Sequence, residues 1–83
     1  MKNVDDDKTL MRSFGDRCRQ LRRRTGMSQM EFSESICMDR SYYASIETGA
    51  RNVTLQSMKK IAMGFDMPLS ELLWGVEYFG PYV

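Results

Sequence analysis

Three times in this sequence, a helix-capping residue stands between two apolar residues that are five positions apart. A Ser, Thr or Asp at the N-cap accepts a hydrogen bond from the first helical turn, and the apolar residues on either side pack across it. At the first of these sites Glu31 follows Ser28 by three residues, which completes a capping box. The three units are Met27-Ser28-Phe32, Met38-Asp39-Tyr43 and Val53-Thr54-Met58. Each unit predicts an abrupt helix start, so the chain must fold from short helices.

Two further helices complete the pattern. The first extends from about Leu10 to Arg24, with one apolar face made by Phe14, Cys18 and Leu21 at helical spacing, and Gly26 ends it. Pro68 marks the start of a very short last helix that carries Leu69, Leu72 and Leu73. No segment alternates with the period of a strand. The sequence therefore predicts an all-α fold, a compact five-helix domain over residues 10–75.

The two ends of the chain differ from this domain. Residues 1–9 are highly charged and contain DDDK, so we expect a flexible arm, either native or the remnant of a tag. Residues 76–83, VEYFGPYV, form an apolar tail. No apolar run approaches the ~20 residues that a membrane span needs, and no signal peptide is recognisable. We therefore expect a cytoplasmic protein without a membrane partner.

Several kinds of chemistry find no support in the composition. Cys18 and Cys37 are two isolated cysteines without an export signal, so they are expected to be free thiols. Without any histidine, they do not make a metal site. There is no phosphate-binding glycine loop and no nucleophile or paired-carboxylate motif. We expect no enzyme activity, no catalytic residues, no cofactor and no small-molecule ligand.

The charge is unevenly distributed. The net charge is only +1, yet residues 11–60 hold ten Lys or Arg against five Asp or Glu. Residues 61–83 hold three acidic and no basic residues. This excess of positive charge over residues 11–60 is a modest indication of a surface that binds a polyanion, although a basic helix exposed to solvent would give the same charge distribution.

The segment MDRSYYASIE predicts a helix with an almost bare outer face. At 100° per residue Tyr43 and Ile46 face the core, while the small residues Ser41, Ala44 and Ser45 face outward between Arg40 and Tyr42. The preceding helix ends two or three residues earlier, which imposes the steep crossing of a helix-turn-helix. Such a helix fits the major groove of DNA, where Arg40 would reach a base and Tyr42 a phosphate.

The motif SQMEFSESICMDRSYYASIETGARN, preceded by RRRTGM, resembles the Cro/C1-type (Xre-like) helix-turn-helix family of bacterial and phage regulators. The run DRSYYASIETGARNVTLQSMKKIA is similar to the controller proteins of restriction–modification systems, with DR-[ST]-Y and RN-x-[ST]-L at the same spacing. The resemblance implies a lambda-repressor-like domain. It also implies a homodimer that binds a near-palindromic operator in double-stranded DNA and controls its own operon.

The resemblance assigns roles to individual residues. Gln29, at the start of the second helix, would bind a phosphate, and a structural ion pair would join Arg22 to Glu47. The residues implied to face bases are Arg40, Ser41, Ala44 and Ser45, and those implied to hold the DNA backbone are Tyr42, Arg51 and Asn52. Asn52 could instead cap its loop. Two departures from the family pattern are Cys37, where the turn usually has glycine, and Ser33, which needs a hydrogen bond if it is buried.

Three alternatives stay open. The other arginines of the first helix are expected to form a solvated face, although some could instead add long-range attraction for DNA; they are Arg17, Arg19, Arg23 and Arg24. The apolar residues from Leu69 onward exceed what one short helix buries, so they either fold back over the core or form a symmetric dimer interface. A regulator with a dimer interface competes with an antitoxin-type protein that binds a toxin through this tail and represses its operon.

Overall fold

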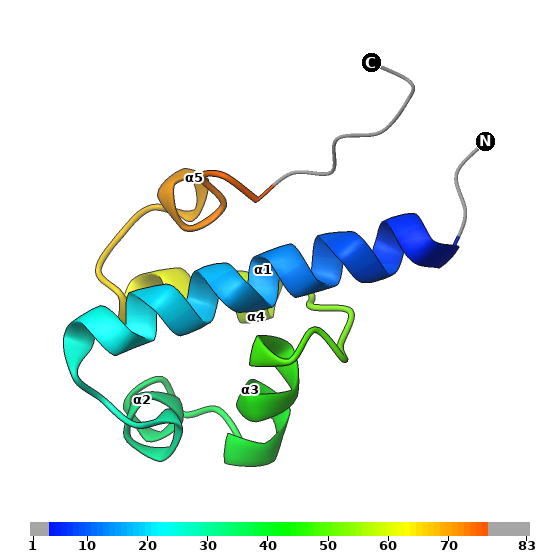
Figure 1. Cartoon of the computed structure of the whole chain (residues 1–83). Coiled ribbons are helices and arrows are strands. Elements are labelled where there is room, and N and C mark those ends of the chain that lie inside the picture. Colours follow the sequence, from blue (N-terminus) through cyan, green and yellow to red (C-terminus); the bar gives the residue numbers. More distant parts are fainter. Residues whose placement is uncertain (1–3, 77–83) are drawn as a thin grey trace.

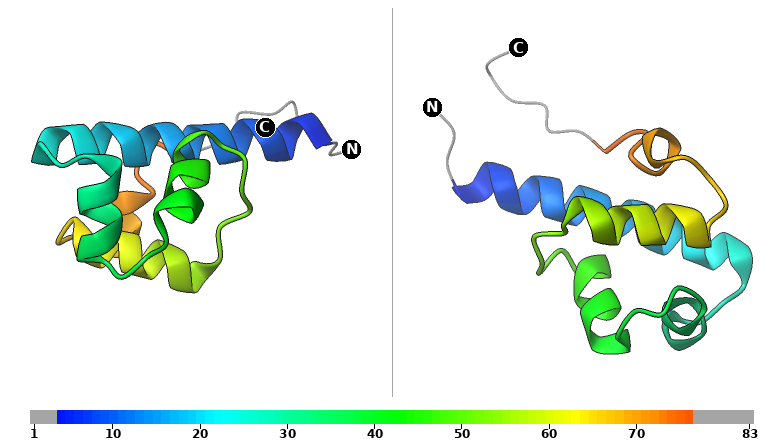
Figure 2. Two further views of the ribbon diagram at one scale, coloured as in Figure 1. Left: turned by 90° about the horizontal axis from the view of Figure 1, so that it is seen from below. Right: turned by 180° about the vertical axis from the view of Figure 1, so that it is seen from behind.

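The structure, a computed structural model, describes residues 4–76 of the chain, with side chains from residue 8 onward. Within these residues it contains no strand and five helices, which are α1 (Val4–Thr25), α2 (Gln29–Ser35), α3 (Arg40–Glu47), α4 (Leu55–Gly64) and α5 (Leu69–Leu72). Helices α1 and α4 lie side by side, with α2 and α3 on one side of them and α5 on the other (Figures 1 and 2). The predicted five-helix, all-α fold is confirmed.

Helix α1 begins earlier than the sequence indicated. It starts at Val4 instead of Leu10, so that residues 4–9 of the expected arm are helical. A helix start favours acidic residues, of which the sequence has three at positions 5–7, because the backbone N–H groups there carry a partial positive charge. Of the apolar tail, Val76 is partly buried against the core, and residues 77–83, with Tyr78, Phe79 and Tyr82, lie outside the described residues.

The three capping units begin helices as predicted. Ser28 Oγ accepts a hydrogen bond from the Glu31 N–H at 3.0 Å, and Glu31 Oε1 accepts one from the Ser28 N–H at 2.8 Å. Asp39 accepts from the Tyr42 N–H at 3.0 Å. Thr54 likewise accepts from the first turn of α4 at 3.1 Å. These caps set where α2, α3 and α4 start, and therefore which residues α3 presents outward.

The turn between α2 and α3 contains the strained residue that the sequence predicted. Cys37 has φ of 55°, a left-handed conformation that a residue with a Cβ adopts at a cost of about 1 kcal/mol. Gly26 ends α1 with φ of 81°, where it has no such penalty. Asp66, between α4 and α5, is also left-handed at 57°, which the sequence analysis did not anticipate.

The core lies where α1, α2, α3 and α4 meet. Its buried apolar residues are Phe14, Cys18, Leu21, Phe32, Ile36, Tyr43, Ile46, Ile61, Ala62 and Leu72. The Phe32 ring stacks on Phe65 with centroids 4.3 Å apart and lies 5.1 Å from the Tyr43 ring. Ser33 is buried and donates to the Met30 carbonyl at 3.0 Å, so its hydroxyl has the required partner. Burial, followed by the charge of Glu47, raises the pKa of Cys18 to about 12, so this thiol stays neutral.

One glycine lets α1 approach the end of α3. A Cβ at Gly15 would lie 2.7 Å from the Glu47 carbonyl oxygen and would also meet the backbone of Ile46. No side chain fits at this crossing without moving one helix. Gly15 therefore sets the distance between the long α1 and the helix that carries the candidate site.

Candidate nucleic-acid interface

Helix α3 has two faces of opposite character. Tyr43, Ile46 and Glu47 are buried against the domain. On the other side, Arg40 and Ser41 are exposed, and Ala44 and Ser45 are half-buried. Because the outward side chains are small, the backbone of α3 is accessible to a surface that approaches from outside. The face predicted from the sequence exists. Its two ends differ in how many of the side chains form hydrogen bonds within the protein.

The first turn of α3 holds the side chains that are most available. Arg40 is the first residue of the helix, directly after the capping residue Asp39, and its guanidinium is exposed. No residue in the described part of the chain forms a hydrogen bond or ion pair with the Arg40 side chain. Ser41 is likewise exposed. The Arg40 guanidinium, with its five N–H donors, is therefore available at the start of α3 for an acceptor from outside the protein.

Tyr42 is held more firmly than the sequence indicated. Its hydroxyl forms a hydrogen bond of 3.2 Å with Ser57 Oγ on α4, and its ring packs against the core. The Arg51 guanidinium lies over this ring, 5.3 Å from the centroid. A tyrosine that is half-buried in this way retains one side of its hydroxyl for a phosphate. The phosphate contact stays a prediction, and the link to Ser57 is new.

Ser45 does not offer a free hydroxyl, contrary to its expected role. Its Oγ donates to the Tyr42 carbonyl at 2.6 Å and accepts from Arg51 Nε at 3.1 Å. A serine hydroxyl has a single hydrogen, so the donor that a base would use is already committed. Arg51 itself is exposed, as is Asn52, whose side chain makes no hydrogen bond within residues 8–76. The loop after α3 thus carries a tethered arginine and an available amide.

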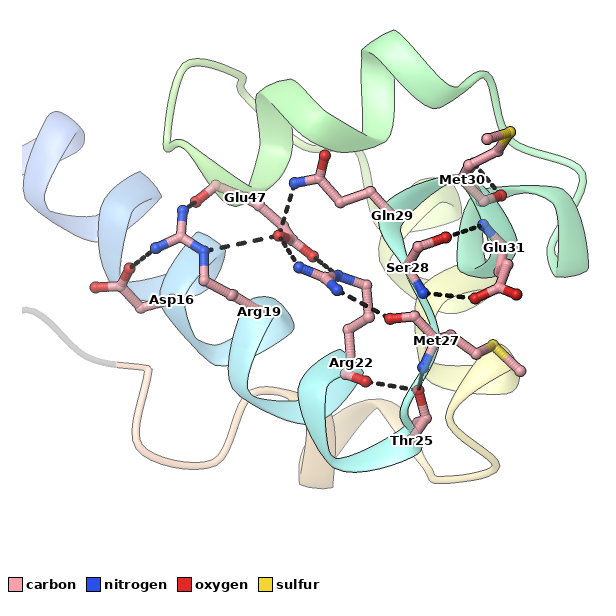
Figure 3. A network of polar contacts seen from close by, with 11 residues as sticks. Asp16, Arg19, Arg22, Thr25, Met27, Ser28, Gln29, Met30, Glu31 and Glu47 are labelled. Carbon is pink, nitrogen blue, oxygen red and sulfur yellow. Dashed lines mark hydrogen bonds and ion pairs between the residues drawn. The ribbon is translucent and has the colours of Figure 1, made fainter.

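A buried carboxylate ties α3 to α1 and α2. The Glu47 side chain is fully buried and accepts hydrogen bonds from Arg22 Nε at 2.7 Å and Arg22 Nη2 at 3.0 Å, a two-pronged pair (Figure 3). Arg19 Nη2 donates to the Glu47 carbonyl at 3.1 Å. The predicted ion pair is confirmed. It fixes the end of α3 on the long helix of the domain.

The same carboxylate takes up the side chain of Gln29. The Gln29 amide donates to Glu47 Oε1 at 3.0 Å, as the close-up shows (Figure 3). The sequence had assigned this side chain to a phosphate. In the structure one N–H of this amide is taken up by the buried Glu47 carboxylate, and the phosphate contact stays a prediction. The Gln29 backbone N–H, at the first position of α2, remains suited to an anion.

The pKa of Glu47 reflects these contacts. Burial disfavours the charged form and would raise the pKa, but hydrogen bonds, led by that from Arg22, and the charge of Arg22 lower it below the ordinary value of 4.5. The same hydrogen bond raises the pKa of Arg22. The pair is therefore ionised throughout the neutral range, and each partner depends on the other.

A comparison with protein-family models matches residues 19–72 to the helix-turn-helix family. The matched stretch contains α2 and α3, the tight turn at Cys37, and the helices that follow. The chain belongs to the helix-turn-helix family. Its members are DNA-binding regulators, and this chain is such a regulator, with α3 as the second helix of the motif.

Several proteins that are similar to this chain are controllers. The chain is 45% identical over 65 residues to the control protein C.MunI of a Mycoplasma species, covering 77% of this chain and 88% of the relative. It is 34% identical to the control protein C.BamHI of Bacillus amyloliquefaciens, over 72% of this chain and 75% of the relative. The crystal structure of the restriction–modification controller C.AhdI from Aeromonas hydrophila superposes with a TM-score of 0.72 at 39% identity. That match covers 75% of this chain and 94% of that one.

Two arginines of this helix-turn-helix protein are structural, and their expected solvated role is wrong. Arg17 donates from Nε and Nη2 to carbonyls at the end of α5, at 3.2 and 2.8 Å, and its guanidinium lies 5.8 Å from the Trp74 ring. Arg19 contacts Glu47 as described above. Both turn inward because helix ends expose unpaired carbonyls that cations satisfy. Arg23 and Arg24, in contrast, are exposed as predicted.

Gly15, Ser57 and Arg17 are the functional supports that sequence reasoning missed. Each acts on a residue far away in the chain, so no local pattern marks Gly15 or Arg17. Only Ser57 had a local signal, since it is three residues after Thr54 in the first turn of α4.

Within the described part of the chain, no helix combines the length and apolar character that crossing a bilayer requires.

Proposed function

We propose that this protein binds as a homodimer to a near-palindromic operator in double-stranded DNA, and that it controls its own restriction–modification operon. The observation that carries the proposal is the outer face of α3, which is lined by small residues and has an unpaired Arg40 at its first turn. The named relatives are control proteins, which supports this assignment over an antitoxin. Such a protein would act in the cytoplasm, at the nucleoid.

The major groove accommodates α3 because it is about 12 Å wide and the helix presents small side chains. Arg40 would donate to O6 and N7 of a guanine, which is the commonest specific contact of arginine. Ser41 and Ala44 would lie against neighbouring base edges. The residues proposed to hold phosphates are the Gln29 backbone N–H, the Tyr42 hydroxyl, Arg51 and Asn52. These contacts with the DNA backbone would fix the position of α3 along the groove.

Arg40→Ala is expected to weaken binding to the cognate operator by about 1–3 kcal/mol and to relax preference at one base pair per half-site. The physical reason is that alanine removes the only long donor at the tip of α3. Fluorescence anisotropy with the cognate duplex and with single-base variants measures both effects. Arg23→Ala, an exposed arginine at the end of α1, is the matched control for charge. If cognate and scrambled duplexes lose affinity equally, Arg40 is a phosphate contact and not a base reader.

The dimer is proposed to form through the region from α5 to the tail. Trp74 is 73% exposed, and Leu69 and Leu73 are only partly buried against the core. A large exposed aromatic residue next to partly covered leucines is typical of a surface that a partner covers. A two-fold axis here would set two α3 helices roughly 34 Å apart, one turn of DNA.

Trp74→Glu is expected to weaken self-association by about 2 kcal/mol, because a charge replaces an aromatic anchor in the proposed contact. Sedimentation equilibrium over a range of concentrations measures the change. Gln56→Glu, which adds the same charge on the exposed surface of α4, should leave the association unchanged. A variant at Trp74 that stays as dimeric as the wild type would place the interface elsewhere.

The test of the function as a whole is selection of bound duplexes from a random pool. A consensus with two-fold symmetry supports a dimer with sequence-specific readout. A consensus without symmetry argues against the dimer, and enrichment of no sequence argues against specific DNA binding by this chain.

A further inference from the structure

We infer that Ser45 is a positioning residue, which holds the Arg51 guanidinium in place for DNA instead of touching DNA itself. The inference deepens the proposed function and rests on it. It starts from two contacts made by the same arginine. Arg51 Nε donates to Ser45 Oγ at 3.1 Å, and its guanidinium carbon lies 5.3 Å from the centroid of the Tyr42 ring.

These two contacts restrain the guanidinium in different ways. The hydrogen bond to Ser45 fixes the position of Nε, while the ring of Tyr42 lies beneath the guanidinium and limits its movement on that side. An arginine has five N–H donors, and only the one on Nε is used here. The four on the terminal nitrogens have no acceptor within residues 8–76. Arg51 therefore presents its two-pronged end already oriented, which suits a phosphate or a base edge.

The hydroxyl of Ser45 is suited to this role and poorly suited to reading a base. Its one hydrogen points to the Tyr42 carbonyl, one turn back in α3, at 2.6 Å. That bond turns a lone pair of the same oxygen toward Arg51. A base acceptor would have to break the bond to Tyr42, and a base donor would have to compete with a cationic N–H.

The platform beneath Arg51 is itself held by α4. The Tyr42 hydroxyl bonds with Ser57 Oγ at 3.2 Å, and Ser57 Oγ accepts from Thr54 Oγ1 at 3.1 Å. Thr54 is the residue that caps α4. A chain of side-chain contacts thus runs from the start of α4 through α3 to the loop. Arg51 therefore rests on side chains that are tied to α3 and α4, and these contacts restrict its rotamers before DNA binds.

A double-mutant cycle tests the inference. Duplex affinity is measured for the wild type, Ser45→Ala, Arg51→Ala and the double variant, using the sequence selected from the random pool. Ser45→Ala is expected to weaken binding about fivefold in the wild type and not at all when Arg51 is already alanine, because coupled residues are not additive. Ser45→Thr, which keeps a hydroxyl, should restore most of the affinity. Thermal unfolding of each variant checks that the fold is intact.

Three outcomes would overturn the inference while leaving specific DNA binding in place. Ser45→Ala could weaken binding equally in both backgrounds, which would make Ser45 a direct contact. Ser45→Ala could leave affinity unchanged although Arg51→Ala lowers it, so that Arg51 needs no positioning. Arg51→Ala could have no effect, in which case there is nothing to position.

A measurement on the free protein separates this inference from the proposed function. Proton exchange at Arg51 Nε, followed by nuclear magnetic resonance, is expected to be slower than at the exposed Arg23 and to speed up in Ser45→Ala. Equal exchange at the two arginines would contradict the hydrogen bond to Ser45. Slow exchange at Arg51 in a protein that selects no duplex would instead retain the contact and reject the DNA-binding proposal.

Discussion

Replacing Glu47 by alanine is expected to lower the free energy of unfolding by about 3–5 kcal/mol, the range for breaking a buried ion pair from one side. The Glu47 side chain is fully buried, and that of Arg22 is only 13% exposed. Removing the carboxylate leaves this guanidinium without its anion and takes the acceptor from the Gln29 amide. Because the free energy of unfolding of a small domain is only about 5–15 kcal/mol, the loss is a large part of the total.

Urea denaturation followed by circular dichroism measures the effect of Glu47→Ala. Glu34→Ala is the matched control, since Glu34 lies exposed on α2 and its loss should change stability by no more than about 0.5 kcal/mol. If Glu47→Ala unfolds at the same urea concentration as this control, the pair does not stabilise the fold, and its place at the end of α3 has another explanation.

The ion pair also predicts a dependence on pH. The pKa of Glu47 in the folded protein lies below its ordinary value of 4.5, so ionisation stabilises the folded state. This contribution is fully present above the unfolded pKa and is lost as the pH falls from about 4.5 through the lower pKa of the folded state. Glu47→Gln removes the titrating group. The stability difference between wild type and Glu47→Gln should therefore shrink on acidification, and a constant difference would contradict this account.

Gly15→Ala is expected to destabilise the protein by about 3 kcal/mol, toward the upper part of the range for overpacking. Alanine favours a helix interior by about 1 kcal/mol over glycine, so propensity alone predicts the opposite sign. The contact outweighs propensity because the added Cβ would lie 2.7 Å from the Glu47 carbonyl oxygen, and a backbone atom cannot rotate away. The change forces α1 and α3 apart at the point where Glu47 is buried.

Thermal and urea unfolding of Gly15→Ala measure the loss. Gln20→Ala is the control, since it also places an alanine in α1 but at an exposed position. Operator affinity provides a second readout, because a displaced α3 would weaken binding even where the protein remains folded. A variant as stable as the control would mean that the helices separate at little cost.

Much of the fold could be predicted from short stretches of sequence. The caps at Ser28, Asp39 and Thr54 act on backbone groups three residues away, so their chemistry is visible locally. The exposed position of Arg40 follows from the same cap and the helical period. The predicted start of α1 was wrong by six residues, because the high charge of residues 1–9 was interpreted as a flexible arm.

The individual roles at the candidate site were harder to predict. Gln29 and Ser45 were both assigned to DNA, and both side chains are engaged within the protein, with Glu47 and with Arg51. The helical period states which way a residue faces. It does not state which polar groups from other elements arrive at the same place, and these decide whether a hydroxyl or an amide is free.

The sequence alone determined the number of helices, where α2 to α4 begin, and the small outer face of α3, because these depend on interactions within one or two helical turns. Only the tertiary structure decided how close α1 lies to α3, how Arg17 joins α5 to α1, and which polar side chains remain available. Those features depend on atoms brought together from distant parts of the chain. Distances between them exist only after the helices have packed.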